Sequence, residues 1–169
     1  EQAMRKANLE KIADNILASA GQQDTLAIDV VAIARHNGFR VSEVMNANIE
    51  SRSYKAVTGQ GEINICLSYN TSIEAKRYTI AYELAHHVLH QKEGFALRKS
   101  LSKRESLRLM KDVEYLARCI LLPRNAFLSA YRKLRQIETK AETIFGLHRI
   151  FRVSSYTIKS RLRDFRWRV

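Results

Sequence analysis

The sequence has few of the residues that cross-link a chain or interrupt its regular structure. Its 169 residues include two cysteines, one proline and six glycines. So few cysteines exclude a small secreted domain held by disulfides, and so little proline and glycine excludes a collagen-like or low-complexity chain. Because Cys66 and Cys119 both lie within apolar stretches, we expect reduced thiols and a cytoplasmic protein.

Long apolar segments are missing as well. No stretch approaches the roughly 18 consecutive apolar residues of a membrane-spanning helix, and residues 1–10 fit neither a signal peptide nor a lipidation site. We therefore expect no membrane partner. A chain of this length can bury about two thirds of its unfolded surface, which is enough for one sizeable core.

Acidic residues are scarce in the second half of the chain. Residues 1–95 contain 10 Lys and Arg against 11 Asp and Glu, whereas residues 96–169 contain 19 against 6. The whole formal net charge of +12 therefore arises in the second half. This asymmetry indicates an acidic protein or nucleic acid as partner, bound more weakly as salt rises; a merely solvated basic surface is the alternative.

Apolar periodicity and turn residues predict an α+β fold with a small antiparallel sheet packed on helices. The expected helices cover residues 3–20, 29–37 and 102–122, together with a motif helix that follows a capping box at 71–74. The expected strands cover residues 39–44, 54–58 and 63–67, with a hairpin turn at Gly59-Gln60-Gly61. Residues 124–169 are expected to form helices joined near Gly146 and at Arg152-Val153.

The last of these helices combines an apolar face with basic residues. Ser154 fits its N-cap, and Ile158, Leu162 and Phe165 form the apolar face. The arrangement is helix-turn-helix-like and indicates a surface that binds a partner protein or nucleic acid. The residues expected to face outward from this surface are Lys159, Arg161, Arg163 and Arg166.

The most specific motif lies in the segment RYTIAYELAHHVLH, residues 77–90. It is the zinc-binding motif H-E-x-x-H with tyrosine, Tyr82, at the first histidine position. In the intact motif two histidines one helical turn apart bind zinc, and the glutamate deprotonates the metal-bound water. Glu83 and His86 keep the positions of the catalytic base and the second ligand.

Tyr82 is a poor replacement for a histidine ligand. A phenol has a reference pKa near 10, so losing its proton at pH 7 costs roughly 4 kcal/mol before the metal contributes. Three interpretations stay open. Tyr82 binds zinc as a phenolate, or its ring fills the space of the missing imidazole and metal, or His86 and His90 form a displaced ligand pair.

Five segments, in order along the chain, resemble the ImmA/IrrE family of bacterial zinc metallopeptidases. They are LAIDVVAIARHNGFRV (26–41), INICLSYN (63–70), RYTIAYELAHHVLH (77–90), DVEYLARCILLP (112–123) and IFRVSSYTIKSRLRDF (150–165). The resemblance implies a zincin-like α+β metallopeptidase domain over residues 1–123, with residues 124–169 as a basic helical extension packed on it. It also implies cleavage of a helix-turn-helix repressor encoded nearby, in mobile elements or stress responses.

By this resemblance the metal ligands fall on Tyr82, His86 and Asp112, and the general base falls on Glu83. Asp112 is one methylene shorter than the family's glutamate, which retracts its oxygens by roughly 1.5 Å, whereas ligand distances tolerate about 0.2 Å. Glu114 is about 200° further round the helix and is expected to point to the opposite face. We therefore expect zinc to be weakly bound or absent.

The function favoured by these residues is that of a degenerate peptidase that binds and regulates a partner. The partner is expected to be a helix-turn-helix transcriptional repressor or another acidic protein. One alternative is an active zinc endopeptidase that cleaves such a repressor with the altered ligands. The other is a basic nucleic-acid-binding protein on a peptidase scaffold.

Overall fold

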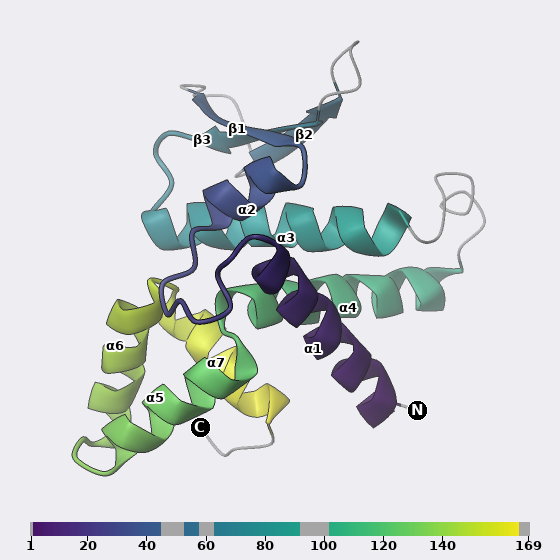
Figure 1. Ribbon diagram of the computed structural model, residues 1–169. Helices are drawn as coiled ribbons and strands as arrows, with labels where there is room; N and C mark the ends of the chain where they lie inside the picture. The colour runs from purple at the N-terminus through teal and green to yellow at the C-terminus, as the bar shows by residue number, and fades with distance from the viewer. Residues whose placement is uncertain (1, 45–52, 58–62, 92–101, 166–169) are drawn as a thin grey trace.

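The computed structural model describes residues 2–44, 53–57, 63–91 and 102–165, which form an α+β fold (Figure 1). The helices and strands of the first part are α1 (Gln2–Ser19), α2 (Val30–His36), β1 (Phe39–Val44), β2 (Ser53–Val57) and β3 (Ile63–Ser68). The helices that follow are α3 (Ile73–Gln91), α4 (Lys103–Leu121), α5 (Arg124–Arg135), α6 (Lys140–Phe151) and α7 (Ser155–Asp164). The predicted fold class is confirmed.

The elements are stacked around the long helix α3. The sheet and α2 lie on one side of α3, and α4 runs along its other side, with α1 crossing α4 (Figure 1). Helices α5, α6 and α7 gather at one end of this stack. Within the parts that the structure describes, every helix is too short or too polar to span a bilayer.

The sheet is mixed, with strand order β1-β3-β2. Strands β2 and β3 are antiparallel, as predicted, but β1 pairs with β3 in parallel, with Phe39 opposite Ile63. Strand β3 takes the central place because it is the most apolar strand, with Ile65 and Leu67 buried. The turn predicted at residues 59–61 lies outside the described residues.

Polar caps set where the two central helices begin. Helix α3 follows Ser72, whose Oγ accepts a hydrogen bond from the Ala75 amide at 3.2 Å. Helix α4 follows Ser102, which forms a reciprocal capping box with Glu105. Helix α4 ends just before Pro123, which lacks the amide that a continuing helix requires. The predicted starts of both helices are therefore confirmed to within a residue or two, although α3 is capped by Ser72, one residue after the predicted Thr71.

The junction between α5 and α6 is not at Gly146, where the sequence predicted it. Gly146 lies inside α6, and a Cβ there would lie 3.0 Å from Cδ1 of Leu134. Glycine is thus used for close helix packing. The chain turns before Thr139, which begins α6 through a capping box with Glu142 that the sequence reasoning overlooked. The second junction is confirmed, with Arg152 in the left-handed conformation at φ 54°.

One hydrophobic core runs through the whole described chain. Its members come from every layer and include Leu17 of α1, Leu84 of α3, Phe127 of α5 and Ile158 of α7. The helices after α4 are therefore packed on the rest of the protein through shared apolar contacts. A division into two domains at residue 123 stays a prediction.

Candidate functional site

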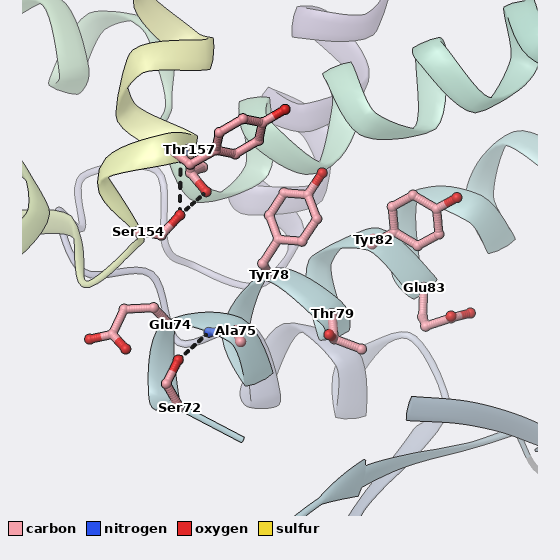
Figure 2. A pocket seen from close by; sticks show the side chains of 10 residues that line it. Ser72, Glu74, Ala75, Tyr78, Thr79, Tyr82, Glu83, Ser154 and Thr157 are labelled. Carbon is pink, nitrogen blue, oxygen red and sulfur yellow. Dashed lines mark hydrogen bonds between the residues drawn. The ribbon is translucent and has the colours of Figure 1, made fainter. Parts of the chain in front are cut away.

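The zincin-like motif forms the middle of α3, and one side of this helix lines a pocket of 680 Å³ (Figure 2). The opposite wall is the N-terminal end of α7. The lining residues are Ser72, Glu74, Ala75, Tyr78, Thr79, Tyr82 and Glu83 on the α3 side and Ser154, Tyr156 and Thr157 on the α7 side. A pocket of about 300–1,000 Å³ is typical of ligand sites.

A row of three rings follows the axis of α3 at intervals of four residues. The ring centroids of Tyr78 and Tyr82 lie 6.4 Å apart, and those of Tyr82 and His86 lie 6.3 Å apart. Figure 2 shows the Tyr78 and Tyr82 rings on the same side of α3, with the Glu83 side chain directed away from them. The Tyr82 hydroxyl and the Glu83 carboxylate therefore do not converge on one point.

The electrostatic surroundings keep the two phenols protonated. Burial raises the pKa of Tyr82 above its ordinary value, and the negative charges of Glu114 and Glu83 raise it further. Burial also raises the pKa of Tyr78; there the Arg118 guanidinium acts to lower the pKa and Glu114 to raise it. In this state the tyrosines serve as hydrogen-bond donors and acceptors and as aromatic surfaces.

Asp112 is not brought to this pocket. Its carboxylate accepts a hydrogen bond from Arg5 of α1 and borders a separate hollow of 220 Å³ beside α1 and α4. Glu114 also borders that hollow, and it is the α4 carboxylate whose charge acts on Tyr78 and Tyr82. The assignment of Asp112 as a zinc ligand stays a prediction.

The described side chains do not fit the zinc site that the resemblance implies. A catalytic zinc requires three protein ligands at about 2.0–2.3 Å around one point. Within residues 2–44, 53–57, 63–91 and 102–165, no three His, Cys, Asp or Glu side chains form a group that could hold a metal ion. His87 packs edge-on against Phe39, at 4.9 Å between centroids, and the side chain of His90 lies outside the described part.

Of the four cations predicted to bind a partner, Lys159 and Arg163 are exposed. The prediction that Arg161 faces outward is wrong, because its side chain is fully buried. Its guanidinium donates to both carboxylate oxygens of Glu10, at 2.9 and 2.8 Å. A buried guanidinium requires such a charged partner. Arg166 lies outside the described residues.

Glu10 is the centre of a buried polar network that the sequence reasoning missed. The Tyr115 hydroxyl donates to it at 2.9 Å, and a guanidinium nitrogen of Arg161 lies 3.3 Å from Sγ of Cys119. Burial alone would raise the pKa of Glu10. The hydrogen bonds and charge of Arg161, with the Tyr115 hydrogen bond, outweigh burial and lower that pKa. Burial raises the pKa of the Cys119 thiol well above its usual range, so this thiol stays protonated.

Comparison with known proteins agrees with the fold. A transcriptional regulator of Mycobacterium tuberculosis superposes with a TM-score of 0.69 at 21% sequence identity, over 92% of this chain and 46% of the regulator. This chain thus spans less than half of that protein's length, and at this identity the likeness concerns the fold alone. None of the curated proteins matches the chain by sequence. Residues 36–163 match the IrrE N-terminal-like domain, and since this match covers most of the chain, the chain belongs to the ImmA/IrrE family.

Proposed function

We propose that this chain is a non-catalytic member of its family, which binds a segment of a regulatory protein in the pocket between α3 and α7 without cleaving it. The observation that carries the proposal is the divergence of the expected zinc donors. The Tyr82 ring lies between those of Tyr78 and His86, whereas Asp112 is held by Arg5 beside a different hollow. Zinc is accordingly bound weakly or not at all.

The pocket itself supports a binding role. A volume of 680 Å³ lined by hydroxyl groups, aromatic rings and carboxylates gives a partner both shape and hydrogen-bonding groups to recognise. Glu83 then acts as a hydrogen-bond acceptor and not as a general base. Its position on the wall of the pocket serves binding equally well.

The proposed partner is a helix-turn-helix transcriptional repressor. Family resemblance supports this choice, and the shared fold of a transcriptional regulator is consistent with it. The alternative of an active zinc endopeptidase that uses Tyr82, His86 and Asp112 would require Asp112 to leave Arg5 and α4 to turn. The placement of these side chains therefore favours binding over cleavage.

The test combines metal analysis with a cleavage and binding assay. The full chain is purified without chelators, dialysed and analysed for zinc, and then mixed with the repressor encoded beside it. We expect well under one zinc per chain and saturable binding by calorimetry, with the repressor intact in mass spectra even after zinc is added. One equivalent of zinc together with a cut repressor, and loss of the cut in Glu83→Gln, would establish the endopeptidase instead.

A further inference from the structure

Helix α5 has a basic outer face without a carboxylate. The helix lies at the end of the molecule away from the sheet (Figure 1), and its 12 residues include four cations and neither aspartate nor glutamate. Every exposed residue of α5 is cationic or neutral and polar, and so is the C-cap residue that follows it. We call this surface the α5 face; its residues are Arg124, Asn125, Ser129, Arg132, Lys133, Arg135 and Gln136.

The carboxylates that follow α5 in the described chain do not pair with this face. Glu142 accepts hydrogen bonds from the amide and the hydroxyl of Thr139, at 2.9 and 2.6 Å. Asp164 is bound by Arg118 through two hydrogen bonds of 2.8 and 3.1 Å. Glu138 meets Arg135 only through its backbone carbonyl, at 3.1 Å, which leaves the guanidinium charge in place.

The cations of the α5 face are accordingly not neutralised within the described part of the protein. Arg132 and Lys133 form no ion pair with any described carboxylate. Residues 124–142 as a whole contain five Lys and Arg against two Glu. This end of the molecule therefore presents a positive charge to its surroundings.

The helix dipole accounts for only part of this charge. Arg132, Lys133 and Arg135 occupy the last turn of α5, where cations offset the dipole. The dipole amounts to about half a negative charge, whereas these side chains carry three positive charges. An ordinary exposed helix face mixes both signs, as α4 does with Glu105 and Arg108. The surplus on α5 thus indicates an anionic partner.

The neutral side chains of the face suit a phosphate backbone. At about 100° per residue, a stripe about 60° wide contains Asn125, Ser129, Arg132 and Gln136. Asparagine, serine and glutamine contact phosphate oxygens in nucleic-acid complexes together with arginine and lysine. A helix that binds a membrane surface instead inserts apolar side chains, and all apolar residues of α5 are at least partly buried.

Charge density favours duplex DNA over an acidic peptide. A duplex carries one negative charge per about 1.7 Å of its axis. An extended peptide advances about 3.4 Å per residue, so even an unbroken run of glutamates has about half that density. Arg124 and Arg135 lie about 16 Å apart along the axis of α5, and over this length a duplex presents the larger charge.

We propose that the α5 face binds the phosphate backbone of double-stranded DNA without reading its sequence. Its cations neutralise phosphates, and its neutral side chains donate hydrogen bonds to phosphate oxygens. Helix α7, which the sequence indicated as the partner surface, has only Lys159 and Arg163 as exposed cations, because Arg161 is buried. This inference is independent of the proposed function, since no residue of α5 lines the pocket between α3 and α7.

The test measures binding of a labelled DNA duplex of scrambled sequence by fluorescence anisotropy, at salt concentrations from about 50 to 200 mM. The α5 variant carries Arg132→Gln and Lys133→Gln, which preserve helix propensity. Its slope of log affinity against log salt should be shallower by about 1.8, or 0.9 for each lost contact. The matched control, Lys11→Gln with Arg35→Gln, removes two exposed cations from α1 and α2 and should keep the wild-type slope.

The outcomes separate this inference from the proposed function. An equal slope in all three proteins, or an equal change in both variants, would overturn the α5 face as a DNA surface. Tighter binding of poly-glutamate or of phosphatidylserine vesicles than of the duplex, at the same salt, would assign the face to an acidic protein or a membrane instead. Repressor binding should be unchanged in the α5 variant, and its loss with an intact circular dichroism spectrum would overturn the independence of the two surfaces. Zinc-dependent cleavage of the repressor would refute the proposed function alone.

Discussion

Replacing Arg161 with methionine should destabilise the protein severely. The guanidinium is fully buried and donates to both oxygens of Glu10 and, at 3.1 Å, to the carbonyl of Leu122. Its removal leaves the Glu10 carboxylate buried without its cationic partner, although the Tyr115 hydroxyl still donates to it at 2.9 Å. Breaking a buried ion pair in this way costs about 3–5 kcal/mol, a large part of the roughly 5–15 kcal/mol that stabilises a typical domain.

Urea denaturation followed by circular dichroism measures this loss. Thermal unfolding should show the same loss. In a chain of this size each kcal/mol of unfolding free energy corresponds to about 2–4 °C of melting temperature, so the melting temperature should fall by about 6–20 °C. The control is Arg163→Met, an exposed position on the same helix, which should change stability by no more than about 0.5 kcal/mol. Adding Glu10→Gln to Arg161→Met should recover part of the loss, since no unpaired charge then remains buried. Equal stability of the two single variants would refute the reasoning.

The pH dependence provides an independent check. In the native chain the pKa of Glu10 is lowered from 4.5, so its stabilisation is present above that pH and is lost as pH falls through the folded-state pKa. In Arg161→Met the hydrogen bonds and the charge of Arg161 no longer oppose burial, so the pKa of Glu10 rises. The variant should therefore lose less stability on acidification. The difference in unfolding free energy between the two proteins should narrow below about pH 4.5, and a constant difference would contradict this account.

Two further predictions concern the metal and the basic surface. Tyr82→His should raise zinc affinity about tenfold or more by calorimetry, because it returns an imidazole one turn from His86; adding Asp112→Glu should add little, because Arg5 holds position 112. A large gain in zinc affinity from Asp112→Glu would show that the ion pair with Arg5 does not fix the side chain at position 112. Charge reversal at Lys159 and Arg163 should weaken any nucleic-acid binding. It should also make the slope of log affinity against log salt concentration shallower by about 0.9 for each phosphate contact that is lost. Unchanged nucleic-acid binding at low salt would show that Lys159 and Arg163 are only part of a solvated surface.

The sequence predicted what local interactions determine. Helices α3 and α4 each begin at a serine whose hydroxyl accepts a hydrogen bond from the amide three residues later, so the signal lies within one turn of sequence. The α+β class follows from the alternation of short apolar segments. The parallel pairing of β1 with β3 depends on segments separated by β2, so no local pattern specifies it. The missed junction before Thr139 did carry a signal, the T-x-x-E capping box.

Where the side chains of the site lie depends on how each helix is rotated about its axis. Asp112 and Glu114 both stand next to apolar residues in the sequence, so the local pattern does not distinguish them. The position of α1 decides that the Asp112 carboxylate pairs with Arg5. Arg161 was assigned to the outer face because it is charged. Yet it follows Ile158 by three positions, on the apolar side of α7, and its partner Glu10 is 151 residues away. A charge within an apolar helix face was the available signal, but it does not identify the partner.

The distance along the chain between Glu10 and Arg161 has a consequence for biosynthesis. A ribosome that adds about 5–20 residues per second needs roughly 8–30 s to proceed from one residue to the other. Throughout that time α1 carries a carboxylate that cannot enter the core with its final partner. A nascent chain interrupted before α7 is therefore exposed to chaperones and proteases, whereas a complete chain closes its core by joining helices made at the start and the end of this interval. A product that ends before α7 therefore lacks the guanidinium that balances the Glu10 carboxylate in the core.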